Sequence, residues 1–302
     1  MSERLYLRLD EDDAHGPEAD VPAGSLHAFA VAPALAGCVS HVLHCRESVP
    51  DGHELREHVL PDGAVHLVFN LGDPPAAGDA GGGLRIEAIG ASAAPALVRL
   101  RGRIDGWSVT LRPGAAAALL GVPAGEIAGT VVSLEALWRR EAGELLERLH
   151  AAPDDRTRNA LLQRSLLHRL QQAATPRGTT TSAPALHAAH AMAAAGGRRP
   201  LREIARELGL SERRLQQLFH AHVGLAPRQW SRLARLRDCL RGLRREARSA
   251  HAPSWAGLAA DHGFYDQSHL ANEFRALAGM TPGEFLRRAT AHRVAGSSKT
   301  AA

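Results

Sequence analysis

The chain has 302 residues, enough for two ordinary domains that each bury a core of their own. Its 45% hydrophobic and 23% charged residues are typical of a soluble globular protein. The charge is segregated: residues 198–302 hold 19 Lys and Arg against 9 Asp and Glu, a net of +10, whereas residues 1–197 hold 17 against 23, a net of −6. A basic part joined to an acidic part indicates a polyanionic partner for the basic part.

Three cysteines (Cys38, Cys45 and Cys239) are too few and too scattered for a disulfide framework, and their odd number fits a reducing compartment. The first twenty residues are acidic and lack the basic start and apolar stretch of a signal peptide. No apolar run approaches the roughly 18 residues that a membrane-spanning helix needs. We therefore expect a cytoplasmic protein with no membrane partner.

The residue pattern of positions 1–112 predicts mostly strands and turns. Short β-rich segments bounded by Gly, Pro or Asp are Val65–Leu71, Arg85–Gly90 and Trp107–Leu111. The stretch Gly72–Gly83 is rich in Gly, Pro and Ala, and we expect a mobile hairpin loop there.

Helical spacing begins after Pro113, in three segments: Ala115–Leu120, Ser133–Leu149 and Asp154–Leu170. The N-terminal domain is therefore predicted to be α+β, with strands first and helices after. The polar stretch Gln171–Ala183 is the best linker candidate.

Beyond this linker the pattern is helical throughout, which predicts an all-α C-terminal domain with two helix-turn-helix units. The predicted organisation is a sensing or dimerisation domain at 1–170, a linker at 171–183, a DNA-binding domain at 184–289 and a disordered tail at 290–302.

An internal repeat of about 55 residues lies in the basic part, where Ile204–Trp230 matches Leu258–Phe285. Each copy places a glycine five residues after its first apolar position, Gly209 in one and Gly263 in the other. Each then continues through a Leu-x-x-x-Phe pair, a glycine and a proline to an aromatic residue.

The first copy has the features of a helix-turn-helix. Ile204 and Leu208 line one face of a short helix, and the small Ala205 lets a second helix cross closely. Gly209 ends that helix, because a left-handed conformation is least costly for glycine, and Ser211 is a good N-cap for the next. The side chains left outward on the second helix are Glu212, Arg213, Gln216, Gln217 and His220. Arg and Gln suit the edges of guanine and adenine in the major groove.

In the second copy, Asp266 is the expected cap, and Leu270 and Phe274 pack inward. The outward side chains are Gln267, Ser268, His269, Asn272 and Arg275. An ordinary αα-hairpin with a solvated face is the alternative for either copy alone. The repeated punctuation on the basic part of the chain favours DNA binding.

The stretch GFYDQSHLANEFRALAGMTPGEFLR (Gly263–Arg287) is the strongest part of a resemblance to the DNA-binding domain of the AraC/XylS family of transcription regulators. The resemblance covers about 105 residues and implies seven helices, with a long central helix at about Pro227 to Glu246. It also implies recognition helices in successive major grooves, about 34 Å apart.

Transferred to this sequence, the base-reading positions are Arg213, Gln216, Gln217, Gln267, Ser268 and Asn272. The full expected DNA-binding set adds Ser211, Arg214, His220, His269 and Arg275. Family members often carry Arg where this chain has Gln217 and Asn272, so the preferred bases are not transferred. The irregular stretch Ala247–Trp255 leaves the relative pose of the two units open.

The segments Glu57–Leu71 and Trp107–Gly121 resemble an N-terminal domain of unknown function found in a subset of the same family. The expected ligand-binding residues there are Asp62, His66 and Arg112. Arg112, at the head of a helix, either binds an anion with the free backbone amides or bonds a neighbouring carbonyl or carboxylate.

Neither a metal nor a cofactor is expected. His41 and Cys45 would share one face of a strand while His44 points away, and no spacing typical of a closed zinc site is present. No nucleophile elbow, phosphate loop or zincin motif is found, so we expect no catalytic residues and no enzyme activity.

The sequence therefore predicts a transcription regulator that binds double-stranded promoter DNA and is controlled by a small-molecule effector at its N-terminal domain. The alternative is an effector-independent regulator whose N-terminal domain only mediates dimerisation or protein contacts. RNA polymerase and a second copy of the chain are further candidate partners, and activation and repression are both left open.

Overall fold

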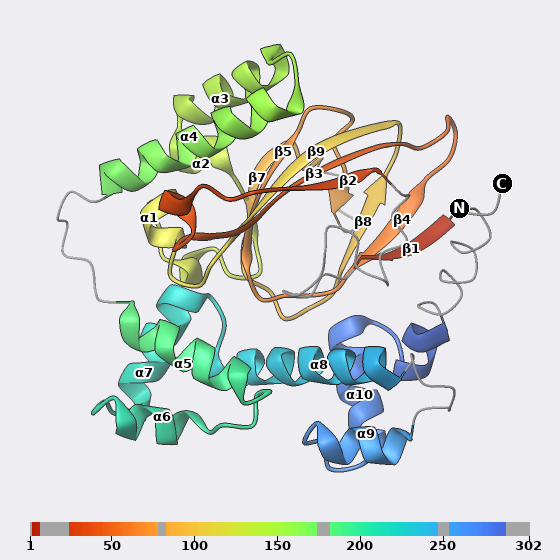
Figure 1. The fold of residues 1–302 in the computed structure, drawn as a ribbon, viewed down its shortest axis with the longest axis vertical. Coiled ribbons are helices and arrows are strands. Elements are labelled where there is room, and N and C mark those ends of the chain that lie inside the picture. The colour runs from red at the N-terminus through yellow and green to blue at the C-terminus, as the bar shows by residue number, and fades with distance from the viewer. Residues whose placement is uncertain (1, 7–23, 78–82, 174–181, 247–253, 288–302) are drawn as a thin grey trace.

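The computed structural model describes residues 2–6, 24–77, 83–173, 182–246 and 254–287, and shows a sheet-rich N-terminal part above a helical C-terminal part (Figure 1). The strands are β1 (Ser2–Tyr6), β2 (Leu26–Phe29), β3 (Val39–Ser48), β4 (Leu55–Val59), β5 (Val65–Asn70), β6 (Ala76–Ala77), β7 (Ile86–Ile89), β8 (Ala96–Leu100), β9 (Arg103–Leu111) and β10 (Val131–Ser133). The helices of this part are the 3-10 helices η1 (Pro33–Leu35) and η2 (Ala124–Glu126), and α1 (Ala116–Leu120), α2 (Leu134–Trp138), α3 (Arg140–Ala151) and α4 (Asp155–Ala173).

The strands form a six-stranded sheet in the order β10-β7-β5-β9-β3-β2 and a four-stranded sheet in the order β1-β4-β8-β6. All the described pairs are antiparallel except β1 with β4. Alternate residues of β5 and β9 point into the core, where Leu67, Phe69, Trp107 and Val109 are buried. The predicted α+β character of this domain, strands first and helices after, is confirmed.

The three predicted strands are confirmed with small shifts at their ends: Val65–Leu71 corresponds to β5, Arg85–Gly90 contains β7, and Trp107–Leu111 is the second half of β9. The prediction that Gly72–Gly83 is entirely loop is wrong, because β6 lies within it and pairs with β8. Ala76 also forms an isolated bridge with Gly83. Residues 78–82, to which the expected mobility also refers, lie outside the described residues.

The expected single helix at Ser133–Leu149 is broken into α2 and α3 at Arg139, whose φ of 56° makes it the one described non-glycine residue with a positive φ. The two pieces pack on different neighbours: α2 lies against β7 and β10, and α3 lies against α4. Between them, the Trp138 ring donates from Nε1 to the carbonyl of Leu119 at 2.9 Å. The sequence does not reveal this change of direction, because the buried apolar residues of α2 and α3 continue one helical spacing along the chain.

The predicted helices Ala115–Leu120 and Asp154–Leu170 are observed as α1 and α4. Asp154 precedes α4 and accepts a hydrogen bond from the amide of Thr157 at 2.7 Å. Because α4 continues to Ala173, it enters the expected linker. Residues 174–181 of that linker lie outside the described residues, as does the predicted tail at 290–302.

The C-terminal part is helical throughout its described residues, as predicted. Its helices are α5 (Ala183–Ala194), α6 (Leu201–Glu207), α7 (Glu212–Val223), α8 (Pro227–Glu246), α9 (Trp255–Asp261), α10 (Gln267–Ala278) and a final segment at 282–287. The expected seven helices are therefore observed. In Figure 1, α8 lies beneath the sheets and connects α5–α7 at one end to α9 and α10 at the other.

Within the described residues, no helix combines the length and apolarity required to cross a membrane.

Candidate DNA-binding surface

The helix α7 presents the first set of expected DNA-binding side chains. Its N-cap Ser211 accepts a hydrogen bond from the amide of Arg214 through Oγ at 3.2 Å, as the sequence predicts. Leu215 and Phe219 are fully buried, which leaves the opposite face of the helix exposed. The exposed residues of the predicted set on or next to α7 are Ser211, Arg213, Arg214, Gln216, Gln217 and His220.

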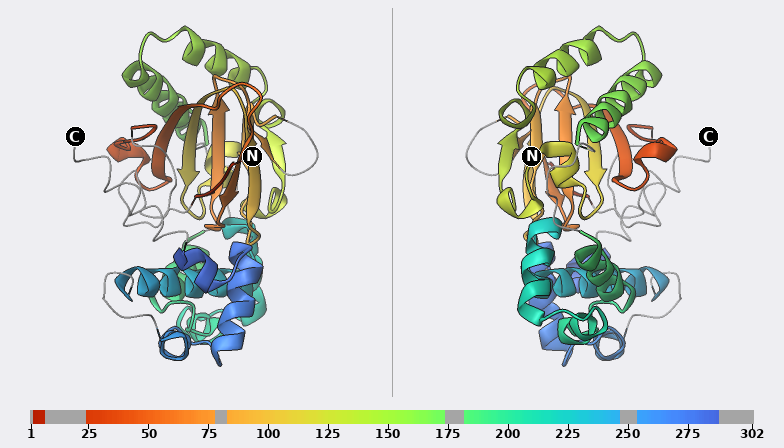
Figure 2. Two further views of the ribbon diagram at one scale, coloured as in Figure 1. Left: turned by 90° about the vertical axis from the view of Figure 1, so that its right-hand side faces the viewer. Right: turned by 90° about the vertical axis from the view of Figure 1, so that its left-hand side faces the viewer.

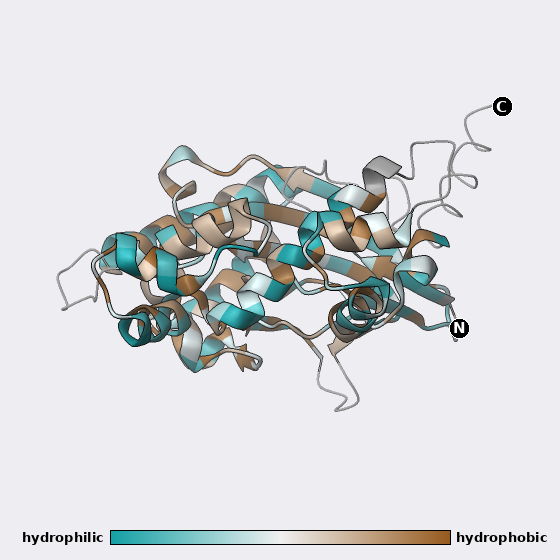
Figure 3. Cartoon of the chain, turned by 90° about the horizontal axis from the view of Figure 1, so that it is seen from below, coloured by the Kyte–Doolittle hydropathy of each residue, from teal (hydrophilic) through white to brown (hydrophobic). Residues whose placement is uncertain are grey.

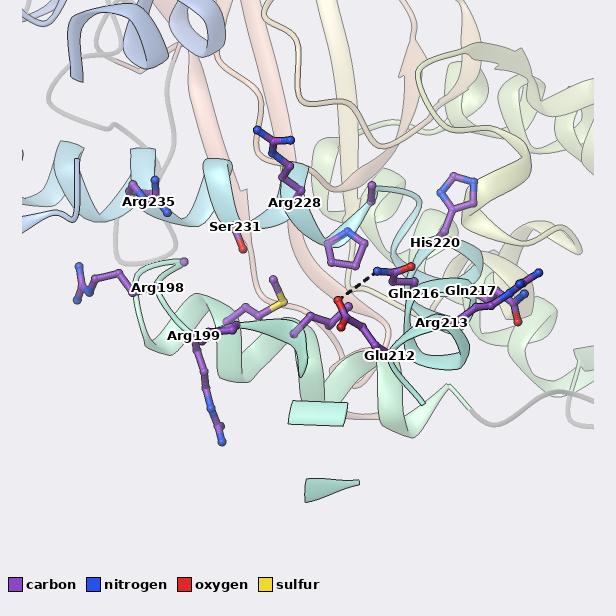
Figure 4. Close-up of a pocket in the computed structure, with 16 residues that line it drawn as sticks. Arg198, Arg199, Glu212, Arg213, Gln216, Gln217, His220, Arg228, Ser231 and Arg235 are labelled. Carbon is purple, nitrogen blue, oxygen red and sulfur yellow. Dashed lines mark hydrogen bonds between the residues drawn. The ribbon is translucent and has the colours of Figure 1, made fainter. Parts of the chain in front are cut away.

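A groove of about 870 Å³ runs beside this exposed face, between α7, the start of α8 and the turn that connects α5 to α6 (Figure 4). From α7 it is lined by four of the predicted residues, Arg213, Gln216, Gln217 and His220. The other basic side chains that line it were not among the predicted set; they are Arg198, Arg199, Arg228 and Arg235. The sequence signal for these residues is the net positive charge of the segment. Net charge does not tell which arginines share a surface, so it could not single them out.

The helix α10 presents the second set. Its N-cap Asp266 accepts from the amide of His269 at 2.7 Å, again as predicted, and Leu270 and Phe274 are buried. The exposed members of the predicted set are Gln267, Ser268, Asn272 and Arg275.

His269 differs from these residues, because its ring has internal partners. Its Nδ1 accepts a hydrogen bond from the amide of Tyr265 at 3.1 Å, and its ring packs edge-on against Phe264 with centroids 5.7 Å apart. Tyr265, directly before the cap, is 91% exposed and was missed by the sequence reasoning. An aromatic residue immediately before a helix cap was the available signal.

The helices α7 and α10, which carry the predicted DNA-binding residues, run along the same side of the C-terminal domain, as the two opposite views of Figure 2 show. Figure 3, which views this domain from below, shows hydrophilic and hydrophobic residues interleaved along its helices. Both helices thus present exposed polar faces.

The C-terminal end of α7 contacts the N-terminal domain. The carbonyl of His222 accepts a hydrogen bond from the amide of Gly114 at 2.8 Å. His220 lies beside η2, since a Cβ built on Gly125 would be 3.2 Å from its Nε2. His220 is thus positioned both at the groove and at the contact between the domains.

Asp62 and His66, two of the three expected ligand-binding residues, form a pair at the same interface. Asp62 Oδ1 lies 3.0 Å from His66 Nε2 and accepts from the amide of Ala64 at 2.9 Å. Arg237 of α8 donates to the backbone carbonyl of Asp62. The pair therefore lies against the helix that connects the two helix-turn-helix units.

The electrostatics of this pair favour its charged form. Burial alone would raise the pKa of Asp62, but the charge and hydrogen bond of His66, followed by the charge of Arg237, hold it well below its usual range. Burial alone would lower the pKa of His66, but the charge and hydrogen bond of Asp62 raise it above its ordinary value.

Arg112, the third expected ligand-binding residue, bonds a carbonyl. Its Nε donates to the backbone oxygen of Ala36 at 2.8 Å, which is one of the two roles that the sequence left open. His44, in contrast, is fully buried, with Nε2 2.9 Å from Asp105 and its ring stacked on Trp107. Across the described ranges, no group of three or more His, Cys, Asp or Glu side chains could hold a metal ion.

Two family models match the chain. Residues 204–288 match a helix-turn-helix domain, and residues 27–133 match a domain of unknown function, DUF6597. The first match contains α7 and α10, and the second contains most of the six-stranded sheet. The protein is thus a DNA-binding transcription regulator. More narrowly, it carries a helix-turn-helix domain of the AraC type and, on its N-terminal side, a DUF6597 domain, as both resemblances in the sequence indicate.

Solved structures of ToxT from Vibrio cholerae are similar to this chain at low identity. One is 11% identical with a TM-score of 0.43, and covers 88% of this chain and 98% of ToxT. A second, of ToxT bound to an unsaturated fatty acid, is 10% identical with a TM-score of 0.43 over 81% of this chain and 94% of ToxT. A third, of ToxT bound to (E)-4-(8-methylnaphthalen-1-yl)but-3-enoic acid, is 11% identical with a TM-score of 0.44 over 82% of this chain and 99% of ToxT.

Proposed function

We propose that this regulator binds promoter DNA sequence-specifically by inserting α7 and α10 into successive major grooves on one face of the duplex. The observation that carries the proposal is the placement of two capped helices with exposed polar faces on one side of the basic domain. Successive major grooves are about 34 Å apart, and a recognition helix contacts base edges mainly through its N-terminal residues.

The residues proposed to contact DNA keep the roles predicted from the sequence. On the first unit they are Ser211, Arg213, Arg214, Gln216, Gln217 and His220. On the second unit they are Gln267, Ser268, His269, Asn272 and Arg275. Arg213 and Gln217 are exposed and free to reach base edges, whereas Ser211 already caps α7, which suits a contact to the phosphate backbone.

The N-terminal domain is proposed to control this binding in response to a small-molecule effector. The contact of α8 with Asp62 supports this proposal, because it connects the sheet domain to the helix that carries both DNA-binding units. The alternative is a domain that only mediates dimerisation or protein contacts. RNA polymerase and a second copy of the chain remain candidate partners.

Selection from a random duplex library by the full chain tests DNA binding. We expect an enriched motif with two half-sites. The logarithm of the binding constant should fall linearly with the logarithm of the salt concentration, with a slope of about −0.9 for each phosphate neutralised. The absence of an enriched motif, or an affinity insensitive to salt, would overturn the proposal.

A thermal-shift screen of the full chain against metabolites tests the effector. A ligand that binds only the folded state at 100 times its Kd stabilises by about 2.7 kcal/mol, so a true effector should raise the melting midpoint. A metabolite that raises the midpoint and also changes the affinity for the selected duplex would support effector control over a purely structural N-terminal domain.

A further inference from the structure

Asp238, on α8, receives one side chain from each helix-turn-helix unit. Its Oδ2 accepts a hydrogen bond from Nη1 of Arg198 at 3.0 Å, and the same oxygen lies 2.9 Å from Nδ1 of His262. Arg198 lies in the turn that precedes α6 of the first unit, and His262 directly follows α9 of the second. A single carboxylate oxygen on the connecting helix therefore bridges the two units.

The packing around this bridge is close. His262 is 5% exposed, and a Cβ built on Gly242 of α8 would lie 2.3 Å from its Nε2, so the ring occupies the space that a side chain at position 242 would need. Nη1 of Arg198 is also 3.5 Å from the backbone carbonyl of Asp261, and its side-chain stem lies against Gly263. The first unit thus contacts the end of α9 directly as well as through Asp238.

Two other polar contacts of α8 each secure one unit only. Arg232 pairs with Glu273 of α10 at 2.7 Å, which secures the second unit. Trp230 donates from Nε1 to the carbonyl of Ala189 in α5 at 3.0 Å, which secures the first. Asp238 differs from these contacts because its bonds fix both units at one point along α8.

We propose that Asp238, with Arg198 and His262, fixes the relative pose of α7 and α10 and so determines which spacing between two DNA half-sites the protein accepts. This inference rests on the proposed function. One added base pair moves a half-site by about 3.4 Å and turns it by roughly 35° about the duplex axis. Two units held rigidly cannot follow that change, whereas two units released from a common anchor can adjust to it.

The test uses the full chain, the duplex motif selected by the unmodified protein, and variants of that duplex with one base pair removed or with one or two inserted between the half-sites. The unmodified protein should lose about tenfold in affinity for each step away from the selected spacing, comparable to a mismatched base pair. Asp238→Asn, and separately Arg198→Gln, should reduce that loss to about threefold or less. The double variant should be no more tolerant than either single variant, since both remove the same coupling.

Asp261→Asn is the matched control. It removes a carboxylate next to the bridge, while the bond to Arg198 at this position comes from the backbone carbonyl. This variant should keep the spacing profile of the unmodified protein, and the melting midpoints of all variants establish that they are folded.

Three outcomes would overturn the inference. If both variants are folded and keep the original spacing profile, Asp238 does not set the pose. If Arg198→Gln weakens binding equally at every spacing and reduces the salt slope by about one, Arg198 is a phosphate contact instead. If the unmodified chain selects no motif at all, the proposed function itself fails, and this result is distinct from the other two.

Discussion

The guanidinium group of Arg237 donates a hydrogen bond to the backbone carbonyl of Asp62, so the helix that joins the two DNA-binding units is bonded directly to the N-terminal domain. The neighbouring Gly63 has a φ of 71° and lies against Leu233 of α8. The turn that connects β4 to β5 is therefore a docking point for α8. This contact joins the sheet domain to the helix that lies between the two helix-turn-helix units.

Gly63→Leu should separate the two domains. A Cβ at this position would be 2.9 Å from Cδ1 of Leu233, 3.1 Å from Cδ1 of Leu225 and 3.2 Å from the Trp230 ring, so a leucine side chain requires these side chains or α8 to move. We expect a larger radius of gyration in small-angle X-ray scattering, and faster proteolysis between the domains.

Gly52→Leu is the control for Gly63→Leu. Gly52 has nearly the same backbone conformation, with a φ of 72°, but no atom lies within 4 Å of a Cβ built on it. Both variants should lose about 1–2 kcal/mol from the left-handed backbone alone. Equal scattering profiles for the two variants would contradict the role assigned to Gly63.

The Asp62–His66 pair should make stability depend on pH. The pKa of His66 is raised in the folded state, so its contribution is fully present below the unfolded value of 6.5 and is lost as pH rises through the folded value. The pKa of Asp62 is lowered, so its contribution is present above 3.8 and is lost only as pH falls well below that value. Arg237, Thr110 and the backbone amide of Ala64 also face the pair.

The measurement is the melting midpoint of the full chain and of His66→Gln at pH 5.5, 7 and 9. The difference between the two proteins should be largest at pH 5.5 and should shrink as pH rises, because the pair then loses its charged imidazolium. A difference that stays constant over this range would show that the histidine charge does not stabilise the fold.

The sequence predicted the C-terminal domain closely because its signals are local. Gly209 and Gly263 end helices with positive φ, and Ser211 and Asp266 cap the helices that follow, as expected from residue type and spacing alone. The boundaries of α8 coincide with those implied by the family resemblance.

Contacts between distant segments were not predictable in the same way. The prediction that Asp62 and His66 bind a ligand did not include their position against Arg237, which lies 175 residues from Asp62 along the chain. No periodic pattern reports such a pairing. Likewise, the backbone turn at Arg139 conflicts with a continuous apolar stripe, so only the packing of α2 and α3 on different partners reveals it.

Phe274→Ala should destabilise the second helix-turn-helix unit. The ring is fully buried and packs edge-on against Phe285 with centroids 5.6 Å apart, so its removal leaves a cavity that typically costs about 3–5 kcal/mol. Differential scanning calorimetry should show a lower melting midpoint, while Phe274→Leu, which keeps most of the volume, should fall in between. A midpoint for Phe274→Ala equal to that of the parent would contradict the core assignment.

Arg213→Ala should relax base preference at one position of the selected motif. The side chain is exposed on α7, and loss of a base-reading arginine costs about 1–3 kcal/mol. The control is Arg202→Ala, which removes the same charge from an exposed position on α6. Repeating the duplex selection with each variant should give a degenerate position for the first and an unchanged motif for the second. Identical motifs from both would exclude base readout by Arg213.

Tyr265 should contribute to DNA affinity without contributing to stability. Its side chain is 91% exposed, directly before the N-cap of α10, which is the end of a recognition helix that approaches DNA. A tyrosine hydroxyl at this place can donate to a phosphate oxygen, and hydrogen bonds to charged groups are worth about 1.5–3 kcal/mol.

Tyr265→Ala should therefore raise the Kd about tenfold or more on every duplex tested, with a melting midpoint close to that of the parent, because surface substitutions usually change stability by about 0.5 kcal/mol or less. Tyr265→Phe distinguishes the hydroxyl from the ring: a phosphate contact predicts that it loses as much affinity as Tyr265→Ala. Retained affinity in Tyr265→Phe would assign the contact to the ring face. Retained affinity in Tyr265→Ala would remove this residue from the DNA-binding surface, and with it the expectation that the first residues of α10 approach the duplex.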